Sequence, residues 1–165
     1  MTVEKSIAIC PGSYDPVTNG HLDVIRRASE LYHEVVIAVV NRSVRKNATL
    51  FGIDERLAFI RNATAGLPNV RAEPFNTLVV DFAISVGAKV IVKGLRAISD
   101  FEYEFEMNQL NSRQAPEIES VYLMAGPRYS FLSSSGVKEL ATFGGRIDDL
   151  VPDDVARRLQ EELRR

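Results

Sequence analysis

The chain has 165 residues, a formal net charge of −2 and 25% charged residues, which is the composition of an ordinary globular protein. Nucleic-acid-binding domains usually carry a strong basic excess, so nucleic acid is not expected as the main partner. No stretch approaches the ~20 apolar residues of a membrane span. The single cysteine, Cys10, excludes an intrachain disulfide framework. These features predict a cytoplasmic protein without a membrane partner, in which Cys10 has a packing role.

Short apolar runs alternate with segments of helical period along the whole chain. The runs predicted as strands are residues 7–10, 35–40, 70–75, 89–92 and 120–125. The segments predicted as helices are residues 21–31, 53–65, 78–86, 100–111 and 136–142, and a last helix that opens at Pro152. Most of the strands are nearly continuous apolar runs, as expected where both faces of a sheet are covered.

This alternation predicts an α/β fold with an open, mostly parallel, five-stranded sheet. The arrangement is Rossmann-like and doubly wound, and residues 1–165 are expected to form a single domain. In such sheets ligands bind beyond the carboxyl ends of the strands. The loops that follow the strands are therefore where the chemistry is expected.

Three local expectations concern the helices. The spacing of Ser99 and Glu102 is that of a capping box, which predicts a helix start there. On the second predicted helix, the side chain of Arg56 is expected to face water. Asp100, Glu102 and Glu106 are expected to form a solvated acidic face.

The loop after the first predicted strand, residues 11–21, combines residue types that suit a phosphate. Ser13 supplies a hydroxyl, and Thr18 or Asn19 can cap the helix that follows. The N-terminus of a helix is an anion site, and His21 in the first turn can donate a hydrogen bond or carry a positive charge. The sequence contains neither the P-loop pattern nor the dinucleotide fingerprint, so a nucleotide would be held in another way.

Cations and hydroxyls follow two further predicted strands. Lys93 and Arg96 flank Gly94 after the fourth strand, and two cations beside a glycine suit phosphate binding. Residues 133–135 are three serines that precede a predicted helix, where hydroxyl and N–H groups can form a second phosphate cradle. We expect these segments to converge with residues 11–21 in one pocket.

Taken together, these motifs resemble those of the bacterial phosphopantetheine adenylyltransferases. Residues 18–21, Thr-Asn-Gly-His, resemble the T/H-x-G-H signature of the nucleotidyltransferase superfamily, and residues 92–96, 100–104 and 129–135 match the family in the same order. The resemblance covers essentially the whole chain. It implies transfer of AMP from ATP to 4′-phosphopantetheine, with dephospho-coenzyme A and pyrophosphate as products. It also implies a homohexamer, and coenzyme A as a further ligand in the role of product or inhibitor.

The resemblance implies a set of site residues as well. It places catalytic roles at His21 and at a basic position that falls on Arg45, with Lys46 as the adjacent alternative. The implied ATP contacts are Ser13, Tyr14, His21, Gly94, Leu95, Arg96, Glu104, Tyr129, Ser130, Phe131, Leu132, Ser133, Ser134 and Ser135. The implied contacts with the acceptor substrate are Ser13, Arg45, Val79 and Lys93. Mg²⁺ is expected as the cofactor, bound mainly through the ATP phosphates and not by a protein metal site.

Other functions stay open at this point. A sister nucleotidyltransferase would use another acceptor, such as nicotinamide mononucleotide, or a phosphorylated alcohol with CTP. A non-catalytic nucleotide sensor on the same fold would bind ATP without releasing pyrophosphate. The superfamily shares its fold core with class I aminoacyl-tRNA synthetases, which raises tRNA binding, but the sequence offers no recognisable anticodon module or basic face.

Overall fold

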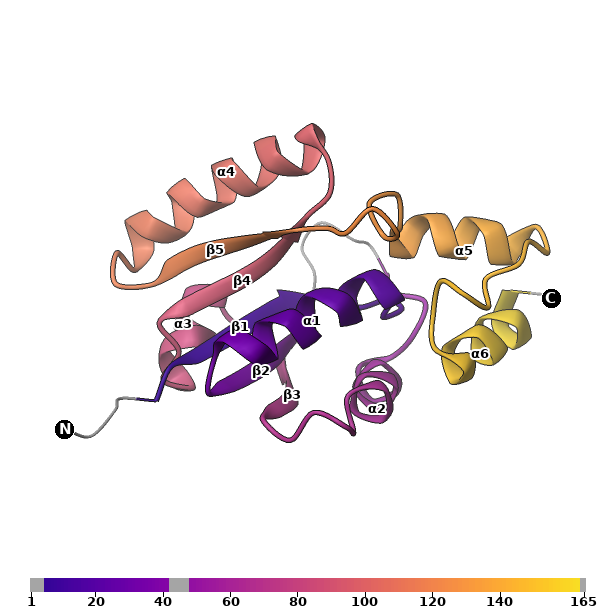
Figure 1. Ribbon diagram of the computed structural model, residues 1–165, viewed down its shortest axis with the longest axis horizontal. Coiled ribbons are helices and arrows are strands. Elements are labelled where there is room, and N and C mark those ends of the chain that lie inside the picture. Colours follow the sequence, from indigo (N-terminus) through magenta and orange to yellow (C-terminus); the bar gives the residue numbers. More distant parts are fainter. Residues whose placement is uncertain (1–4, 42–47, 164–165) are drawn as a thin grey trace.

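Strands and helices alternate along the computed structural model, which describes residues 5–41 and 48–163 (Figure 1). The strands are β1 (Ile7–Gly12), β2 (Glu34–Val40), β3 (Val70–Phe75), β4 (Val90–Leu95) and β5 (Glu119–Met124). The helices are α1 (Asn19–Leu31), α2 (Ile53–Ala63), α3 (Val79–Ser85), α4 (Ile98–Gln114), α5 (Ser134–Thr142) and α6 (Asp153–Leu163). Within these two ranges, no helix is both long enough and apolar enough to cross a bilayer.

All five strands are parallel and form one open sheet in the order β3-β2-β1-β4-β5. β1 pairs with β2 along its whole length, but it pairs with β4 only at Ala8 and Ile9, whose partners are Val90 and Ile91. Beyond these residues β1 and β4 separate. The crevice that opens lies at the point where the strand order reverses, which is where ligands bind in open α/β sheets.

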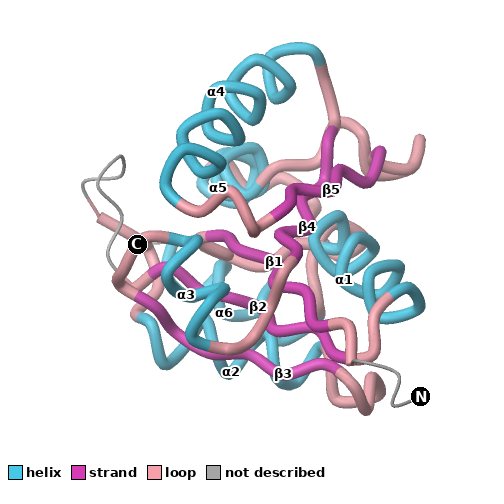
Figure 2. Tube along the Cα trace, turned by 90° about the vertical axis from the view of Figure 1, so that its left-hand side faces the viewer, coloured by secondary structure: helices cyan, strands magenta, loops and turns pink. Residues whose placement is uncertain are grey.

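Two apolar layers cover the sheet, because successive strand residues point to opposite faces. Ala8, Cys10 and Ile37 belong to the layer that also contains buried residues of α1, α2, α5 and α6. Ile9 and Val36 belong to the opposite layer, with buried residues of α3. Figure 2 shows α1 and α4 on opposite sides of β4. The predicted doubly wound, Rossmann-like α/β arrangement is confirmed.

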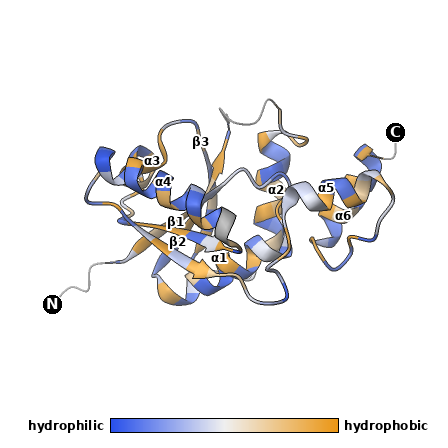
Figure 3. Cartoon of the chain, turned by 90° about the horizontal axis from the view of Figure 1, so that it is seen from above, coloured by the Kyte–Doolittle hydropathy of each residue, from blue (hydrophilic) through white to orange (hydrophobic). Residues whose placement is uncertain are grey.

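Helices α5 and α6 lie together at the end of the molecule toward which the strands run (Figure 1). α6 carries hydrophobic and hydrophilic residues on different sides (Figure 3), and its buried residues are Val155, Ala156 and Leu159. α5 in turn begins beside the β1–α1 loop, where the Ser134 hydroxyl donates to the carbonyl oxygen of Pro16 at 2.8 Å. This packing brings the N-terminus of α5 to the crevice.

The start of α4 differs from the prediction. The helix begins at Ile98, and its N-cap is Ala97, which makes no side-chain capping bond. The predicted capping box at Ser99 is therefore wrong, because Ser99 lies inside the helix. A capping box does occur at the start of α1, between Thr18 and His21.

Cys10 is a packing residue, as predicted. Its side chain is 2% exposed within β1. Burial raises the pKa of the Cys10 thiol to about 12. The thiol therefore stays protonated near neutral pH, and the thiolate needed for nucleophilic chemistry is not formed.

Arg56 departs most clearly from the sequence expectation, since it is 1% exposed instead of facing water. Its guanidinium donates to the carbonyl oxygens of Phe51 at 3.1 Å, Ser13 at 2.6 Å and Val40 at 2.9 Å. Buried carbonyl groups need donors, and a guanidinium supplies several in a fixed geometry. Arg56 thereby ties the end of β2 to the loop after β1 and to the segment that precedes α2.

Replacing Arg56 by Met is expected to lower the free energy of unfolding by about 3 kcal/mol or more, because three carbonyl groups lose a charged donor. Urea unfolding followed by circular dichroism measures this loss. Arg61→Met is the matched control on the same helix, since Arg61 is exposed and donates one bond, to the Ala72 carbonyl at 3.3 Å. That control is expected to lose no more than about 1 kcal/mol. Equal losses of unfolding free energy in the two variants would contradict the role of Arg56 as a stabilising donor to three carbonyl groups.

Candidate functional site

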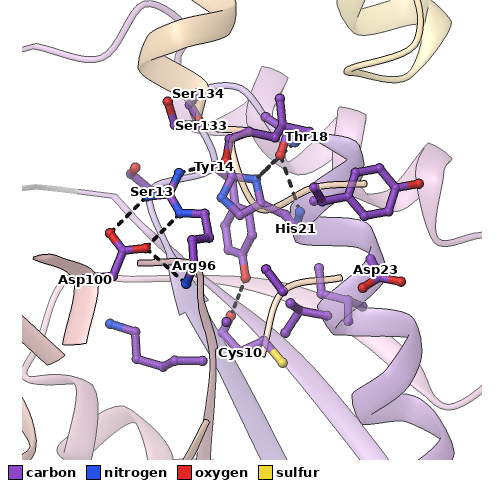
Figure 4. A pocket seen from close by; sticks show the side chains of 18 of the residues that line it. Cys10, Ser13, Tyr14, Thr18, His21, Asp23, Arg96, Asp100, Ser133 and Ser134 are labelled. Carbon is purple, nitrogen blue, oxygen red and sulfur yellow. Dashed lines mark hydrogen bonds and ion pairs between the residues drawn. The ribbon is translucent and has the colours of Figure 1, made fainter. Parts of the chain in front are cut away.

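A cavity of about 370 Å³ lies between the separating ends of β1 and β4. This volume is in the range of small-molecule sites. The β1–α1 loop, the end of β4, the start of α4 and the turn before α5 contribute its walls. The residues implied by the sequence that line it are Ser13, Tyr14, His21, Lys93, Gly94, Arg96, Glu104, Tyr129, Leu132, Ser133, Ser134 and Ser135. The segments expected to converge therefore do so in space (Figure 4).

Some implied residues lie elsewhere. Those described by the structure that do not line the cavity are Leu95, Ser130, Phe131 and Val79. Phe131 is 71% exposed and borders a second, apolar hollow beside α5. Val79 opens α3 and packs against the apolar layer on the other face of the sheet. Arg45 and Lys46 lie outside the described residues, so their catalytic role stays a prediction.

His21 is fixed by the capping box at the start of α1. The main-chain N–H of Thr18 donates to Nδ1 of His21 at 3.0 Å, and Thr18 Oγ1 accepts from the main-chain N–H of His21 at 3.3 Å. A ring nitrogen that accepts a main-chain hydrogen bond carries no proton, so the ring proton is on Nε2. Of the two roles that the sequence left open, the geometry assigns His21 that of a neutral hydrogen-bond donor.

Tyr14 supports the His21 ring from within the loop. The two rings meet edge to face, with their centroids 5.0 Å apart. Tyr14 has a φ of 49°, which is uncommon for a residue other than glycine, and its hydroxyl donates to the carbonyl oxygen of Cys10 at 2.8 Å. Burial raises the pKa of the Tyr14 hydroxyl, which keeps it protonated as a donor. The loop conformation and the orientation of His21 are thus linked.

Two cations lie at the end of β4, Lys93 within the strand and Arg96 just after it, and each is paired with a carboxylate of α4. Lys93 Nζ lies 2.7 Å from Glu104 Oε1, and Arg96 Nε lies 2.9 Å from Asp100 Oδ2. Arg96 also donates to the Leu132 carbonyl oxygen at 2.7 Å. The end of β4 is therefore connected both to α4 and to the turn before α5. These pairs orient the two cations at the wall of the cavity.

The acidic residues of α4 do not form one solvated face. Glu102 and Glu106 are exposed as expected, but Asp100 is partly buried and lines the cavity, so for Asp100 the expectation is wrong. The cavity carboxylates Asp23, Asp100 and Glu104 all pair with arginine or lysine. Among the described residues, no group of three or more histidine, cysteine or carboxylate side chains is placed to hold a metal ion.

The three serines before α5 have different partners. Ser133 is the N-cap of α5, and its hydroxyl oxygen accepts from the N–H of Gly136 at 3.0 Å. Ser134 bonds to Pro16, as described above, while Ser135 is exposed. Neither α1 nor α5 has an acidic residue in its first turn. Two helix N-termini therefore border one cavity, and neither has a carboxylate in its first turn. This arrangement favours the binding of an anion in the cavity.

Gly94 allows α1 to pass close to β4. A Cβ atom at this position would lie 2.9 Å from Cγ2 of Val24 on α1. A side chain at residue 94 would therefore force the Val24 side chain to shift and disturb the packing of α1 on β4. Because His21 is in the first turn of the same helix, the absence of a side chain at Gly94 helps to set the distance from His21 to β4.

Two charged residues behind the cavity, Asp15 and Lys138, were not among the predicted site residues. Asp15 is 0% exposed, and its carboxylate accepts from the main-chain N–H groups of Leu50 and Phe51 at 2.9 Å each and from Lys138 Nζ at 3.0 Å. Burial raises the pKa of Asp15, but the main-chain bonds and Lys138 outweigh this effect and lower the pKa below its usual value. An Asp-Pro pair in a loop indicates only a turn, so the sequence held no signal for this network.

Comparisons with known proteins agree on one family. Residues 9–140 match the family model described as cytidylyltransferase-like. A phosphopantetheine adenylyltransferase from Rubrobacter xylanophilus is 51% identical over 156 residues, which cover 94% of each chain. The enzymes of that name from Deinococcus radiodurans and Desulforudis audaxviator are 50% and 49% identical. The alignment with the Deinococcus enzyme covers 88% of this chain and 86% of the relative, and the alignment with the Desulforudis enzyme covers 95% of each.

Structural comparison adds support for the fold. A crystal structure described as a candidate nicotinate-nucleotide adenylyltransferase from Vibrio parahaemolyticus superposes with a TM-score of 0.68. It is 20% identical, and the match covers 97% of this chain and 95% of the other. At this identity the likeness concerns the fold alone. From the sequence relatives, and within the wider cytidylyltransferase-like group, the chain belongs to the phosphopantetheine adenylyltransferase family.

Proposed function

We propose that this chain transfers AMP from ATP to the phosphate of 4′-phosphopantetheine, producing dephospho-coenzyme A and pyrophosphate. The observation that carries the proposal is the convergence of two helix N-termini, a neutral histidine donor and two oriented cations on one cavity. Such a cavity suits two phosphate-bearing substrates. The names of relatives about half identical over most of the chain agree with this choice of acceptor.

In the proposed reaction an oxygen of the acceptor phosphate attacks the α-phosphorus of ATP. A new P–O bond forms, and the bond between the α-phosphorus and the oxygen that bridges it to the β-phosphorus breaks. Pyrophosphate leaves with the electron pair of that bond. Because the attacking oxygen is already anionic, no side-chain nucleophile is needed, and the protein positions two anions and stabilises spreading charge.

His21 would donate its Nε2–H to a non-bridging oxygen of the α-phosphate. As a neutral donor, it does not need to lose or gain a proton during the reaction. The hydrogen bond strengthens as negative charge grows on that oxygen, which lowers the barrier more than it tightens the binding of ATP. The main-chain bond from Thr18 to Nδ1 keeps this donor in place.

The remaining contacts would divide between the substrates. The β- and γ-phosphates would lie at the N-terminus of α5, beside Ser133–Ser135. Ser13 and Lys93 would hold the phosphate of the acceptor, with Lys93 kept in place by Glu104. Arg45 or Lys46 remains our proposed second catalytic cation.

Mg²⁺ is proposed to arrive with ATP. The cavity carboxylates Asp23, Asp100 and Glu104 are already paired with cations, which fits a metal that is bound mainly through the nucleotide phosphates. The ion would neutralise part of the charge on the triphosphate. The residues of this chain would bind the phosphates, and the phosphates would in turn bind the ion.

We further propose a cytoplasmic homo-oligomer, with six subunits as the family resemblance implies, and coenzyme A as an additional ligand. Exposed apolar side chains support self-association: Phe101, Phe105 and Leu110 on α4, and Met124 at the end of β5. Large exposed apolar groups often mark protein interfaces. Light scattering of the purified chain measures the subunit number, and a monomer at all concentrations would contradict the assembly.

A substrate panel tests the proposed reaction. ATP is offered with 4′-phosphopantetheine or nicotinamide mononucleotide, and CTP with a phosphorylated alcohol, while pyrophosphate release is recorded. We expect the fastest release with ATP and 4′-phosphopantetheine. Faster release with another pair would favour a sister nucleotidyltransferase. Tight ATP binding without release for any acceptor would favour a nucleotide sensor.

Replacing His21 by Ala tests the proposed donor. We expect kcat to fall about 10²- to 10³-fold, as for the loss of a transition-state donor, while the Kd for ATP changes far less. Loss of the capping side chain is expected to cost about 1 kcal/mol of stability, which thermal unfolding measures separately.

The matched control is His33→Ala, because His33 is exposed and hydrogen bonded to Ser6, away from the cavity. This variant should retain the wild-type kcat. The ¹⁵N spectrum of the ligand-free protein at mildly alkaline pH should show the ring proton of His21 on Nε2. A wild-type kcat in His21→Ala would remove this residue from the chemistry.

A further inference from the structure

Two side-chain bonds join α5 to the β1–α1 loop. The Ser134 hydroxyl donates to the Pro16 carbonyl oxygen at 2.8 Å, and Lys138 Nζ lies 3.0 Å from Asp15 Oδ2. Ser134 and Lys138 are four residues apart, so they lie on the same side of the helix. The first two turns of α5 are therefore held against the loop, by Ser134 in the first turn and by Lys138 in the second.

Asp15 is itself rigidly held. Its carboxylate is fully buried and also receives the main-chain N–H groups of Leu50 and Phe51. The carbonyl oxygen of Phe51 accepts from Arg56, whose guanidinium also holds the carbonyl oxygen of Ser13 at 2.6 Å. Lys138 therefore bonds to a fixed network and not to a surface carboxylate.

This network lies behind the cavity. Neither Asp15 nor Lys138 belongs to the lining of the cavity, whereas Ser13 and residues 133–135 do. The Lys138–Asp15 pair connects residues 123 positions apart in the sequence, so chain connectivity does not set the spacing between these elements. The spacing depends on the contacts across the gap.

We propose that Lys138 is a positioning residue, which through Asp15 sets the distance between the N-terminus of α5 and the loop that carries Ser13. The inference rests on the proposed function, in which α5 holds the leaving phosphates and the loop holds the attacking one. An in-line transfer requires these two groups to be aligned, and a misplacement of about 1 Å can cost roughly 10²-fold in rate. Lys138 acts on the reaction without touching either substrate.

The test compares Lys138→Met, which keeps the length of the side chain but removes its charge, with Lys138→Arg, which keeps the charge. At a temperature where circular dichroism shows each variant folded, kcat/KM of the Met variant should fall about 10-fold or more, mainly through kcat. The Arg variant should recover most of this loss. Lys89→Met, the same change at an exposed residue beside the opposite end of β4, should keep wild-type kinetics.

A double-mutant cycle with Asp15→Asn identifies the partner. If Lys138 acts through Asp15, the double variant should lose about as much kcat/KM as Asp15→Asn alone. Additive losses would show that Lys138 acts independently of Asp15 and would overturn the proposal. If Asp15→Asn does not fold, the comparison of the Met and Arg variants at position 138 decides. A Met variant with lower thermal stability but wild-type kcat/KM would reduce Lys138 to a structural role and also overturn the proposal.

Binding of ATP separates this inference from the proposed function. If the wild-type chain releases no pyrophosphate with 4′-phosphopantetheine, the proposed function fails, but the Kd for ATP of the same variants can still be measured by calorimetry. A Kd raised about threefold or more in Lys138→Met and restored in Lys138→Arg would then support positioning of the two phosphate-binding ends. An unchanged Kd in Lys138→Met would then overturn it.

Discussion

The early separation of β1 from β4 is the constraint on which the site depends. The two strands pair only at Ala8 and Ile9, and the cavity occupies the space where further pairing would have closed the sheet. Parallel strands place the loop after β1 and the end of β4 at one edge, and α5 packs across that edge. The residues that line the cavity come together because the elements that carry them all border this opening.

Two kinds of contact then fix the geometry around the opening. Main-chain groups orient the site, as when Thr18 determines which nitrogen of His21 carries the proton. Buried charges behind the cavity hold its walls together, as Arg56 and Asp15 do. Since the pKa of Asp15 is lowered in the folded protein, its stabilising contribution is complete above the unfolded pKa and is lost as the pH falls through the folded value. The network is therefore intact near neutral pH.

The sequence predicted the sheet and the convergence of its loops because both leave local signals, whereas further lining residues such as Tyr14 and Glu104 were implied only by the family resemblance. Continuous apolar runs marked the strands, and glycine, hydroxyl and histidine residues marked the loop before α1. Arg56, Asp15 and Lys138 were missed because their partners are main-chain groups or residues distant in sequence, and a single charge on an amphipathic helix usually indicates a solvated face. The tautomer of His21 was likewise beyond the sequence, since it depends on the direction of one main-chain N–H.

The most direct test of this account is a crystal structure of the chain with a non-hydrolysable ATP analogue that has a methylene group between its α- and β-phosphorus atoms. We predict a non-bridging α-phosphate oxygen within hydrogen-bond distance of His21 Nε2, with the outer phosphates at the N-terminus of α5. A nucleotide bound away from the opening between β1 and β4, or an α-phosphate out of reach of His21, would contradict the account.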